Sequence, residues 1–259
     1  MIPTLFEKGP ISIQTLWIFV VIAMLVASFI AVKRLKRHRV NLTLFIEHSG
    51  SFLLSALIFS RLVYFFMNPF MYSQGFKLQT LINLVSFWDQ GFSFFGALLG
   101  FTLMLGYRLR KEKEDIWKWL DALAVPLLIG MGIGYVGAFL GGVAYGSPSS
   151  LPWAIKYETI TVKYTVPIHP IQIYTIILIC AILILKTKLK RKKEFFQKNG
   201  NTALFITSLT SFGLFLLEFL RGDDTLLILG IRSSQIIYVI LFLLSTGLII
   251  YRQKKHEPV

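Results

Sequence analysis

Apolar residues along the chain fall into seven long runs separated by shorter polar segments. We place these runs near residues 13–32, 44–66, 92–107, 117–140, 170–185, 203–220 and 231–251. A helix needs about 20 residues to cross a hydrocarbon core of about 30 Å. Continuous runs of this length do not fit a barrel, whose strands alternate between apolar and polar residues. The pattern therefore predicts an all-α polytopic membrane protein with seven transmembrane helices, forming a single membrane domain over residues 1–259.

The composition agrees with this prediction. Of the 259 residues, 55% are hydrophobic and 15% aromatic, whereas soluble domains are about 45–50% apolar. Two longer connections, residues 67–91 and 141–169, carry many of the polar and aromatic residues outside the runs. Within the second, the alternating segment TITVKYTV (159–166) predicts a short strand or hairpin arm.

The formal net charge of +14 is distributed unevenly. Of the 27 Lys and Arg residues, 19 follow the first, third, fifth and seventh runs. This alternation is the positive-inside bias, which predicts an outside N-terminus and a cytoplasmic C-terminus. The basic connections would then face anionic lipid, and nucleic acid is not an expected partner. The single cysteine excludes an internal disulfide and a multi-cysteine metal site.

Ionisable residues inside the predicted spans are costly and invite explanation. They are Glu47, His48, Arg61, Asp121 and Glu218, with Arg221 three residues after Glu218. A structural interpretation pairs Glu218 with Arg221 on one helix face, lets Arg61 snorkel and makes Asp121 a cap or an interhelical hydrogen-bonding group. A functional interpretation places the same groups around a cavity. The sequence contains no nucleophile elbow, no HExxH, no P-loop and no metal-ligand spacing.

The stretch GIGYVGAFLGGVAYG (132–146) has the GxGxxG spacing of a dinucleotide-binding loop. That fingerprint requires a preceding strand and a following helix start, but these glycines lie inside a predicted span. Gly130, Gly134, Ala138 and Gly142 recur every four residues, which predicts a smooth face for close helix approach.

Several segments together resemble the prolipoprotein diacylglyceryl transferase family over nearly the whole chain. They are GPISIQTLW (9–17), SRLVYFF (60–66), FWDQGFSFFGALLG (87–100), the region from Leu120 to Ile155, IHPIQIYTIIL (168–178), GLFLLEFLRGDD (213–224) and LGIRSSQIIYVI (229–240). Their order and spacing are similar to those of the family motifs. The family transfers diacylglyceryl from phosphatidylglycerol to the lipobox cysteine of a secreted prolipoprotein. The resemblance implies phospholipid and a signal segment as partners, without a cofactor or metal ion.

The resemblance is incomplete at polar motif positions. Phe95 stands where the family carries His, Tyr135 where it carries Arg, and Val143 where it carries Glu. Leu214 and Ile168 each replace an Arg, and Ala138 and Gly141 replace two Asn. The retained residues include Arg61, Trp88, Asp89, Asp121, His169, Gln172, Tyr174, Glu218 and Arg221. Loss of a phosphate clamp and of a positioned base would each slow the reaction by orders of magnitude.

Two interpretations of function therefore stay open. In the first, the chain is a transferase with Glu218 or His169 as the catalytic base, and its substrates contact Arg61, Phe95, Tyr135, Gln172, Tyr174 and Arg221. In the second, it is a catalytically degenerate relative that binds lipid or a signal segment without transfer. A transporter, the generic interpretation of seven spans with buried charge, has no support from an inverted repeat or paired broken helices.

Overall fold

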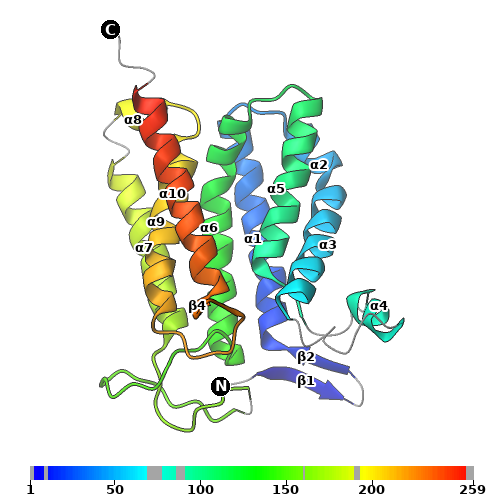
Figure 1. Cartoon of the computed structure of the whole chain (residues 1–259). Coiled ribbons are helices and arrows are strands. Elements are labelled where there is room, and N and C mark those ends of the chain that lie inside the picture. Colours follow the sequence, from blue (N-terminus) through cyan, green and yellow to red (C-terminus); the bar gives the residue numbers. More distant parts are fainter. Residues whose placement is uncertain are drawn as a thin grey trace. The chain divides into compact units, whose positions relative to one another are not determined.

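The structure is a computed structural model and describes residues 3–8, 11–68, 78–85, 91–159, 161–189 and 193–254. It is mostly helical (Figure 1). The helices are α1 (Thr15–Arg37), α2 (Leu42–Glu47), α3 (Ser49–Met67), α4 (Leu78–Val85), α5 (Phe94–Lys111), α6 (Ile116–Gly141), α7 (Ile171–Leu189), α8 (Lys193–Gln197), α9 (Asn201–Glu218) and α10 (Ser233–Lys254). Two antiparallel ribbons accompany them, β1 (Thr4–Lys8) with β2 (Ile11–Gln14) and β3 (Leu227–Ile228) with β4 (Ile231–Arg232).

Six of these helices, α1, α3, α6, α7, α9 and α10, are long and apolar enough to cross a membrane. The multi-pass helical architecture predicted from the apolar runs is thereby confirmed. The expected span at 92–107 corresponds to α5, which is not among the six and carries Arg108, Arg110 and Lys111 in its last turn. The run at 44–66 is divided at His48, which separates α2 from α3.

The prediction of a short strand or hairpin arm at 159–166 was wrong. The described residues of 159–166, which leave out 160, form turns and bends instead of a strand. Main-chain hydrogen bonds of this connection instead join Ile155 to Ile168, and the Val162 side chain packs inward. The alternation of apolar and polar residues here arises because Val162 is buried inside a folded connection, and not because the segment pairs with another strand.

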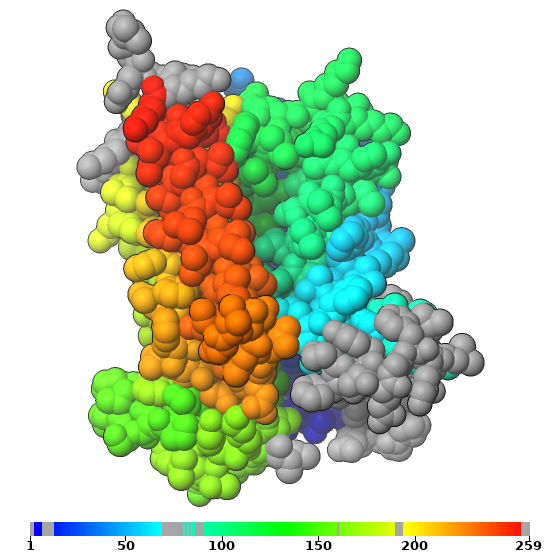
Figure 2. Space-filling model, viewed as in Figure 1, coloured from blue at the N-terminus to red at the C-terminus, as the bar shows by residue number. Residues whose placement is uncertain are grey.

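The described chain divides into two compact units, one comprising Met1–His38 with Trp117–Val259 and the other comprising Arg39–Ile116. In the first unit, α9 lies against both α7 and α10. Its core contains Leu128 of α6, Ile179 and Ile182 of α7, and Ile206 of α9. The outward face of α10, visible along its length in Figure 2, carries exposed apolar side chains. These include Ile240, Leu243, Leu244 and Ile250, as expected for a lipid-facing helix.

Glycines of α6 do allow a close helix approach, but not along the predicted four-residue stripe. A Cβ at Gly137 would overlap Phe19 of α1, and one at Gly130 would press on Ala27. Gly134 faces open space, and Gly142 lies beyond the helix with a φ of +66°. The contact face follows a spacing of seven because a 3.6-residue helix rotates a strict four-residue stripe away from its neighbour.

Asp121 has the capping role that the structural interpretation gave it. Its carboxylate accepts from the Gly200 N–H at 2.7 Å and the Ala203 N–H at 2.8 Å. These are unsatisfied donors of the first turn of α9, whose own preceding residue is a glycine without a capping side chain. A buried acid on α6 therefore fixes the start of α9.

The second unit is built on α3 and α5. Gly96 and Gly100 of α5 meet the α3 backbone so closely that a Cβ at either position would overlap it. Ser55 donates to the Gly100 carbonyl at 2.8 Å and Ser60 to the Ser93 carbonyl at 2.8 Å. Small residues and serine hydroxyls thus hold this pair together, as is usual between membrane helices.

Candidate active site

A buried cluster of four charged side chains lies where α9 ends. The carboxylate–guanidinium cluster consists of Glu218, Arg221, Asp223 and Arg232. Glu218 is only 2% exposed and accepts from Arg221 Nη1 at 2.9 Å and from Arg232 Nε at 2.8 Å. Asp223 accepts from Arg232 Nη2 at 2.8 Å and also pairs with Arg221. Two cations and two anions make the cluster neutral, which is the condition under which buried charge is tolerated.

Local structure at both ends of the cluster explains how it forms. The helix stops at Glu218, and Arg221 follows within one turn, so the predicted i, i+3 pair is confirmed. The β3–β4 ribbon then returns the chain, with Leu227 opposite Arg232. Its two-residue turn has positive φ at Leu229 and Gly230, as a tight hairpin turn requires. This return places Arg232 beside Glu218, 14 residues earlier in the sequence.

The electrostatics of Arg221 follow from its neighbours. Burial alone would lower the pKa of the Arg221 guanidinium, but hydrogen bonding and the charge of Asp223, with the charge of Glu218, outweigh it and raise the pKa. Arg221 is therefore a permanent cation. Both oxygens of Glu218 accept hydrogen bonds from guanidinium groups, so each already has a partner within the cluster.

Tyr135 of α6 is electrostatically coupled to this cluster and to two hydroxyl neighbours. Its phenol interacts with Glu218, Arg221 and Asp223 and hydrogen-bonds with Thr175 of α7 and Tyr238 of α10. The position where the resemblance expects an Arg thus holds an uncharged donor. A guanidinium here would bring a third cation to a cluster whose charges already balance.

The connection between α6 and α7 joins the cluster to the His169 region through its main chain. Gly146 forms an isolated bridge with Arg221, and its N–H donates to the His169 carbonyl at 3.2 Å. A side chain at Gly146 would overlap the His169 backbone, and one at Gly222 would overlap Gly146. Only glycine permits this close crossing of three segments. Gly146, at the end of the 132–146 stretch, therefore serves chain packing next to the charged cluster.

His169 is half-buried and has one hydrogen-bonded ring nitrogen. Its Nδ1 lies 3.4 Å from the Tyr174 hydroxyl, which also accepts from the Trp153 indole N–H at 2.7 Å. The Tyr174 oxygen has a second lone pair beside the one that the indole occupies, and this lone pair can accept a hydrogen bond from His169 Nδ1–H. Within the described residues, Nε2 of His169 makes no hydrogen bond. In the tautomer that carries its proton on Nδ1, the ring donates to Tyr174, and Nε2 keeps a free lone pair that can accept a proton.

Gln172 is fully buried and has a structural set of partners. Its amide donates to the Val143 carbonyl at 2.7 Å and accepts from the Tyr157 hydroxyl at 3.4 Å. Burial raises the pKa of Tyr157 to about 12, although its bond to Gln172 opposes part of this shift. Both groups therefore stay neutral and hold the connection to the start of α7.

Arg61 and Phe95 lie in the second unit. Arg61 is 2% exposed and donates to the Gly91 carbonyl at 2.8 Å and the Leu84 carbonyl at 3.3 Å. The snorkelling interpretation was therefore wrong, because the buried guanidinium donates to the carbonyls of Leu84 in α4 and of Gly91. Phe95 packs edge-to-face on Phe94. Trp88 and Asp89, two retained motif residues, lie outside the described residues.

The structure thus brings together Tyr135, Glu218 and Arg221 in one group and His169 with Tyr174 in a second. Gln172 instead bonds to Val143 and Tyr157. Sequence reasoning missed Arg232, Asp223 and Tyr238 as members of the first group. The available signal was an arginine between apolar residues just before the last span, which charge counting had treated as an ordinary loop cation. The described ranges contain no group of three or more His, Cys, Asp or Glu that could hold a metal ion.

The chain is similar to known proteins over nearly its entire length. The family model of prolipoprotein diacylglyceryl transferase matches residues 3–251. A phosphatidylglycerol–prolipoprotein diacylglyceryl transferase of Pediococcus pentosaceus is 29% identical over 97% of this chain and 90% of its own length. Proteins of the same name from Pasteurella multocida and Thermotoga maritima are 28% and 27% identical, over 86% and 98% of this chain and 80% and 86% of their own lengths.

Proposed function

Because the chain belongs to the prolipoprotein diacylglyceryl transferase family, we propose that it transfers diacylglyceryl from a phospholipid to the cysteine thiol of a prolipoprotein. The observation that carries this proposal is the uninterrupted family match over residues 3–251. Within that match, Glu218 and Arg221 form a buried charged group at motif positions. The phospholipid of the related enzymes, by their names, is phosphatidylglycerol.

The proposed setting is the bacterial cytoplasmic membrane, with α5 as a seventh span, the N-terminus outside and the C-terminus inside. The basic last turns of α1, α5, α7 and α10 support this orientation, since each would end on the cytoplasmic side. The carboxylate–guanidinium cluster and His169 would then lie toward the outer surface, where a secreted polypeptide is accessible.

The chemistry requires a leaving phosphate and an activated thiol. The cysteine sulfur forms a bond to the glycerol carbon of the diacylglyceryl group, and the bond from that carbon to the phosphate oxygen breaks. Glycerol phosphate leaves with the electron pair, and the thiol proton passes to a base. Cations near the phosphate stabilise the charge that develops on the leaving group.

The contacts of this chain suggest which groups take these roles. Arg221 and Arg232 are the cations next to Tyr135, and an incoming phosphate could exchange with Asp223 as their partner. Of the two candidate bases, His169 is the better choice because Glu218 already accepts from two guanidinium groups. Tyr174 and Trp153 would orient the imidazole through Nδ1, as positioned bases generally require.

The proposal is tested with the purified full-length chain in phospholipid nanodiscs. A lipobox peptide is incubated with phosphatidylglycerol labelled in its acyl chains, and thioether-linked product is measured. His169→Gln should lower the rate by about 100-fold or more, whereas Lys156→Gln, a change in the same connection outside these contacts, should leave it unaltered. Absence of product at stoichiometric enzyme, with peptide and lipid both bound, would refute transfer.

A second candidate function, binding of lipid or signal segment without transfer, is favoured by the neutrality of the carboxylate–guanidinium cluster. Two carboxylates already pair with both arginines, so neither cation is left over to neutralise a bound phosphate. Tyr135→Arg separates the two candidates. If the missing cation alone limits the reaction, this variant should gain both phosphatidylglycerol binding and product formation relative to Tyr135→Phe; tighter lipid binding with no product would support the binding function.

A further inference from the structure

A pocket of about 410 Å³ lies at the other end of the first unit, away from the end of α9 that carries the candidate active site. It is lined by the end of α1, the last turns of α7, helix α8 and the start of α9. The lining residues are Arg34, Arg37, His38, Lys186, Phe196, Gln197 and Thr202. All belong to a single compact unit, so the pocket is a feature of that unit alone. Its volume is in the range of small-molecule sites, roughly 300–1,000 Å³.

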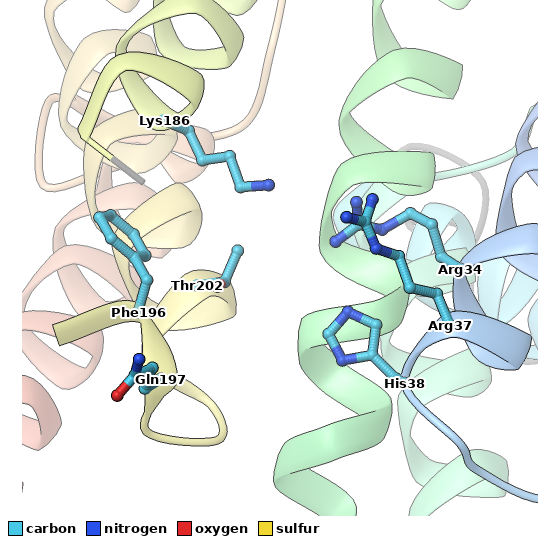
Figure 3. Close-up of a pocket in the computed structure, with 7 residues that line it drawn as sticks. All are labelled: Arg34, Arg37, His38, Lys186, Phe196, Gln197 and Thr202. Carbon is cyan, nitrogen blue, oxygen red and sulfur yellow. The ribbon is translucent and has the colours of Figure 1, made fainter. Parts of the chain in front are cut away.

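The lining carries three permanent cations and no acid. Figure 3 shows Lys186 extending into the gap from one wall and Arg34 and Arg37 lying on the opposite wall. The two guanidiniums are close enough to repel one another electrostatically. Asp121, an acid outside the lining that acts on Arg34 electrostatically, has its carboxylate bonded to the start of α9. Positive charge therefore exceeds negative charge around the pocket.

The two arginines of the pocket keep hydrogen-bond donors that the described part of the protein does not use. Arg34 donates through Nε to the Ala122 carbonyl at 3.0 Å and through Nη2 to the Asp121 carbonyl at 3.1 Å. These two neutral acceptors orient the guanidinium, and the Asp121 carboxylate attracts it electrostatically without forming an ion pair. Within the described part of the chain, the exposed Arg37 has no hydrogen-bond or ion-pair partner. Two guanidiniums and an ammonium are a donor set well suited to phosphate oxygens.

We propose that this pocket binds a phosphate-bearing anion, with the phosphoryl oxygens between Arg34, Arg37 and Lys186. Gln197 and Thr202 supply uncharged polar groups on the wall opposite the arginines, and Phe196 supplies an apolar surface for the organic part of the ligand. Both a phospholipid headgroup and a soluble phosphate have this chemistry. The site is separate from the candidate active site and does not depend on transferase activity.

The test measures binding to the intact chain by native mass spectrometry and by the shift in melting temperature. The probes are inorganic phosphate, phosphatidic acid, and oleate as an anionic lipid without phosphate. Phosphatidylglycerol is left out because the candidate active site would bind it. The Arg37→Gln/Lys186→Gln variant removes two lining cations. The Lys36→Gln/Lys188→Gln variant removes two exposed cations from the same helix ends with the same change in net charge.

We expect removal of the lining pair to weaken phosphate-probe binding at least tenfold, the order expected from losing charge-assisted hydrogen bonds. The control pair should change it by about twofold or less. Binding of inorganic phosphate supports a soluble ligand, and binding of phosphatidic acid alone supports a lipid headgroup. Equal binding of oleate, equal losses in both double variants, or no binding of any probe would overturn the proposal. If the double variant does not fold, the single variant Arg37→Gln is used for the same binding measurement, because this exposed side chain makes no hydrogen bond or ion pair within the described residues.

Discussion

Arg232 is the residue whose removal tests the carboxylate–guanidinium cluster most directly. Replacing it with Leu eliminates the bond from Nε to Glu218 at 2.8 Å and that from Nη2 to Asp223 at 2.8 Å. It also removes the bond from Nη1 to the Asp223 carbonyl at 3.0 Å. The remaining cluster has one cation and two anions. Glu218, at 2% exposure, has no access to water that could replace the lost partner.

The expected magnitude follows from this burial. Removing one partner of a buried ion pair costs about 3–5 kcal/mol. Arg232 and Asp223 retain 15% and 20% side-chain exposure, which favours the lower end, about 3 kcal/mol. For a chain of this size, that corresponds to a melting temperature lower by about 6–12 °C. Adding Asp223→Asn removes the excess anion, so the double variant should be more stable than the sum of the single losses by about 1–2 kcal/mol.

The assay is thermal unfolding in one detergent, followed by circular dichroism for the wild type, both single variants and the double variant. Lys163→Met is the matched control. Its ion pair with Asp224 at 2.7 Å joins side chains that are 44% and 89% exposed, so no resolvable change is expected. A change for Arg232→Leu within about 0.5 kcal/mol, or strict additivity in the double variant, would show that the cluster does not behave as a buried charge-balanced group.

Three further outcomes follow from other contacts. Burial raises the pKa of Tyr157 to about 12. The neutral phenol therefore contributes stability that is fully present below a pH of about 10 and is lost as the pH rises through about 12. The difference in near-ultraviolet phenolate absorbance between wild type and Tyr157→Phe measures the midpoint of this ionisation, and a midpoint at the ordinary tyrosine value would contradict the prediction. Asp121→Ala removes two bonds to the start of α9 and should cost about 2–3 kcal/mol in the same unfolding assay, with Asp121→Asn losing less. Gly146→Ala forces a side chain into the His169 backbone and should lower the melting temperature, whereas Gly106→Ala, which enters open space, should not; equal behaviour of the two would disprove the close crossing.

The overall fold was largely predictable because membrane helices are specified by apolar length alone. Runs of about 20 apolar residues have no alternative way to satisfy their backbone in lipid, and six such helices are present. The short ribbons β1–β2 and β3–β4 escaped prediction since two to five residues carry no usable periodicity. The division at His48 was missed because hydropathy averages over one polar residue, while helix continuity depends on local backbone geometry.

For the site, pairs within one helix turn could be predicted and pairs across the fold could not. Glu218 and Arg221 follow from their spacing alone. Arg232 reaches the same carboxylate only because a two-residue turn reverses the chain, and the hairpin is too short to detect in advance. Asp121 was expected to cap or bond across helices, but its partners lie 79 and 82 residues away, so their identity required the fold.

The contacts of Arg232 give a physical reason for the uncharged residue at position 135. Two guanidiniums and two carboxylates already balance in a poorly hydrated place, and Tyr135 interacts with three of these four groups. A third cation at position 135 would be uncompensated unless an anion such as a lipid phosphate bound permanently, at a cost typical of an unpaired buried charge. Tyr135 avoids that cost and still offers a hydrogen-bond donor. The neutral cluster is therefore stable without ligand, and any anion that binds there must first displace a carboxylate, which favours transient over permanent occupancy.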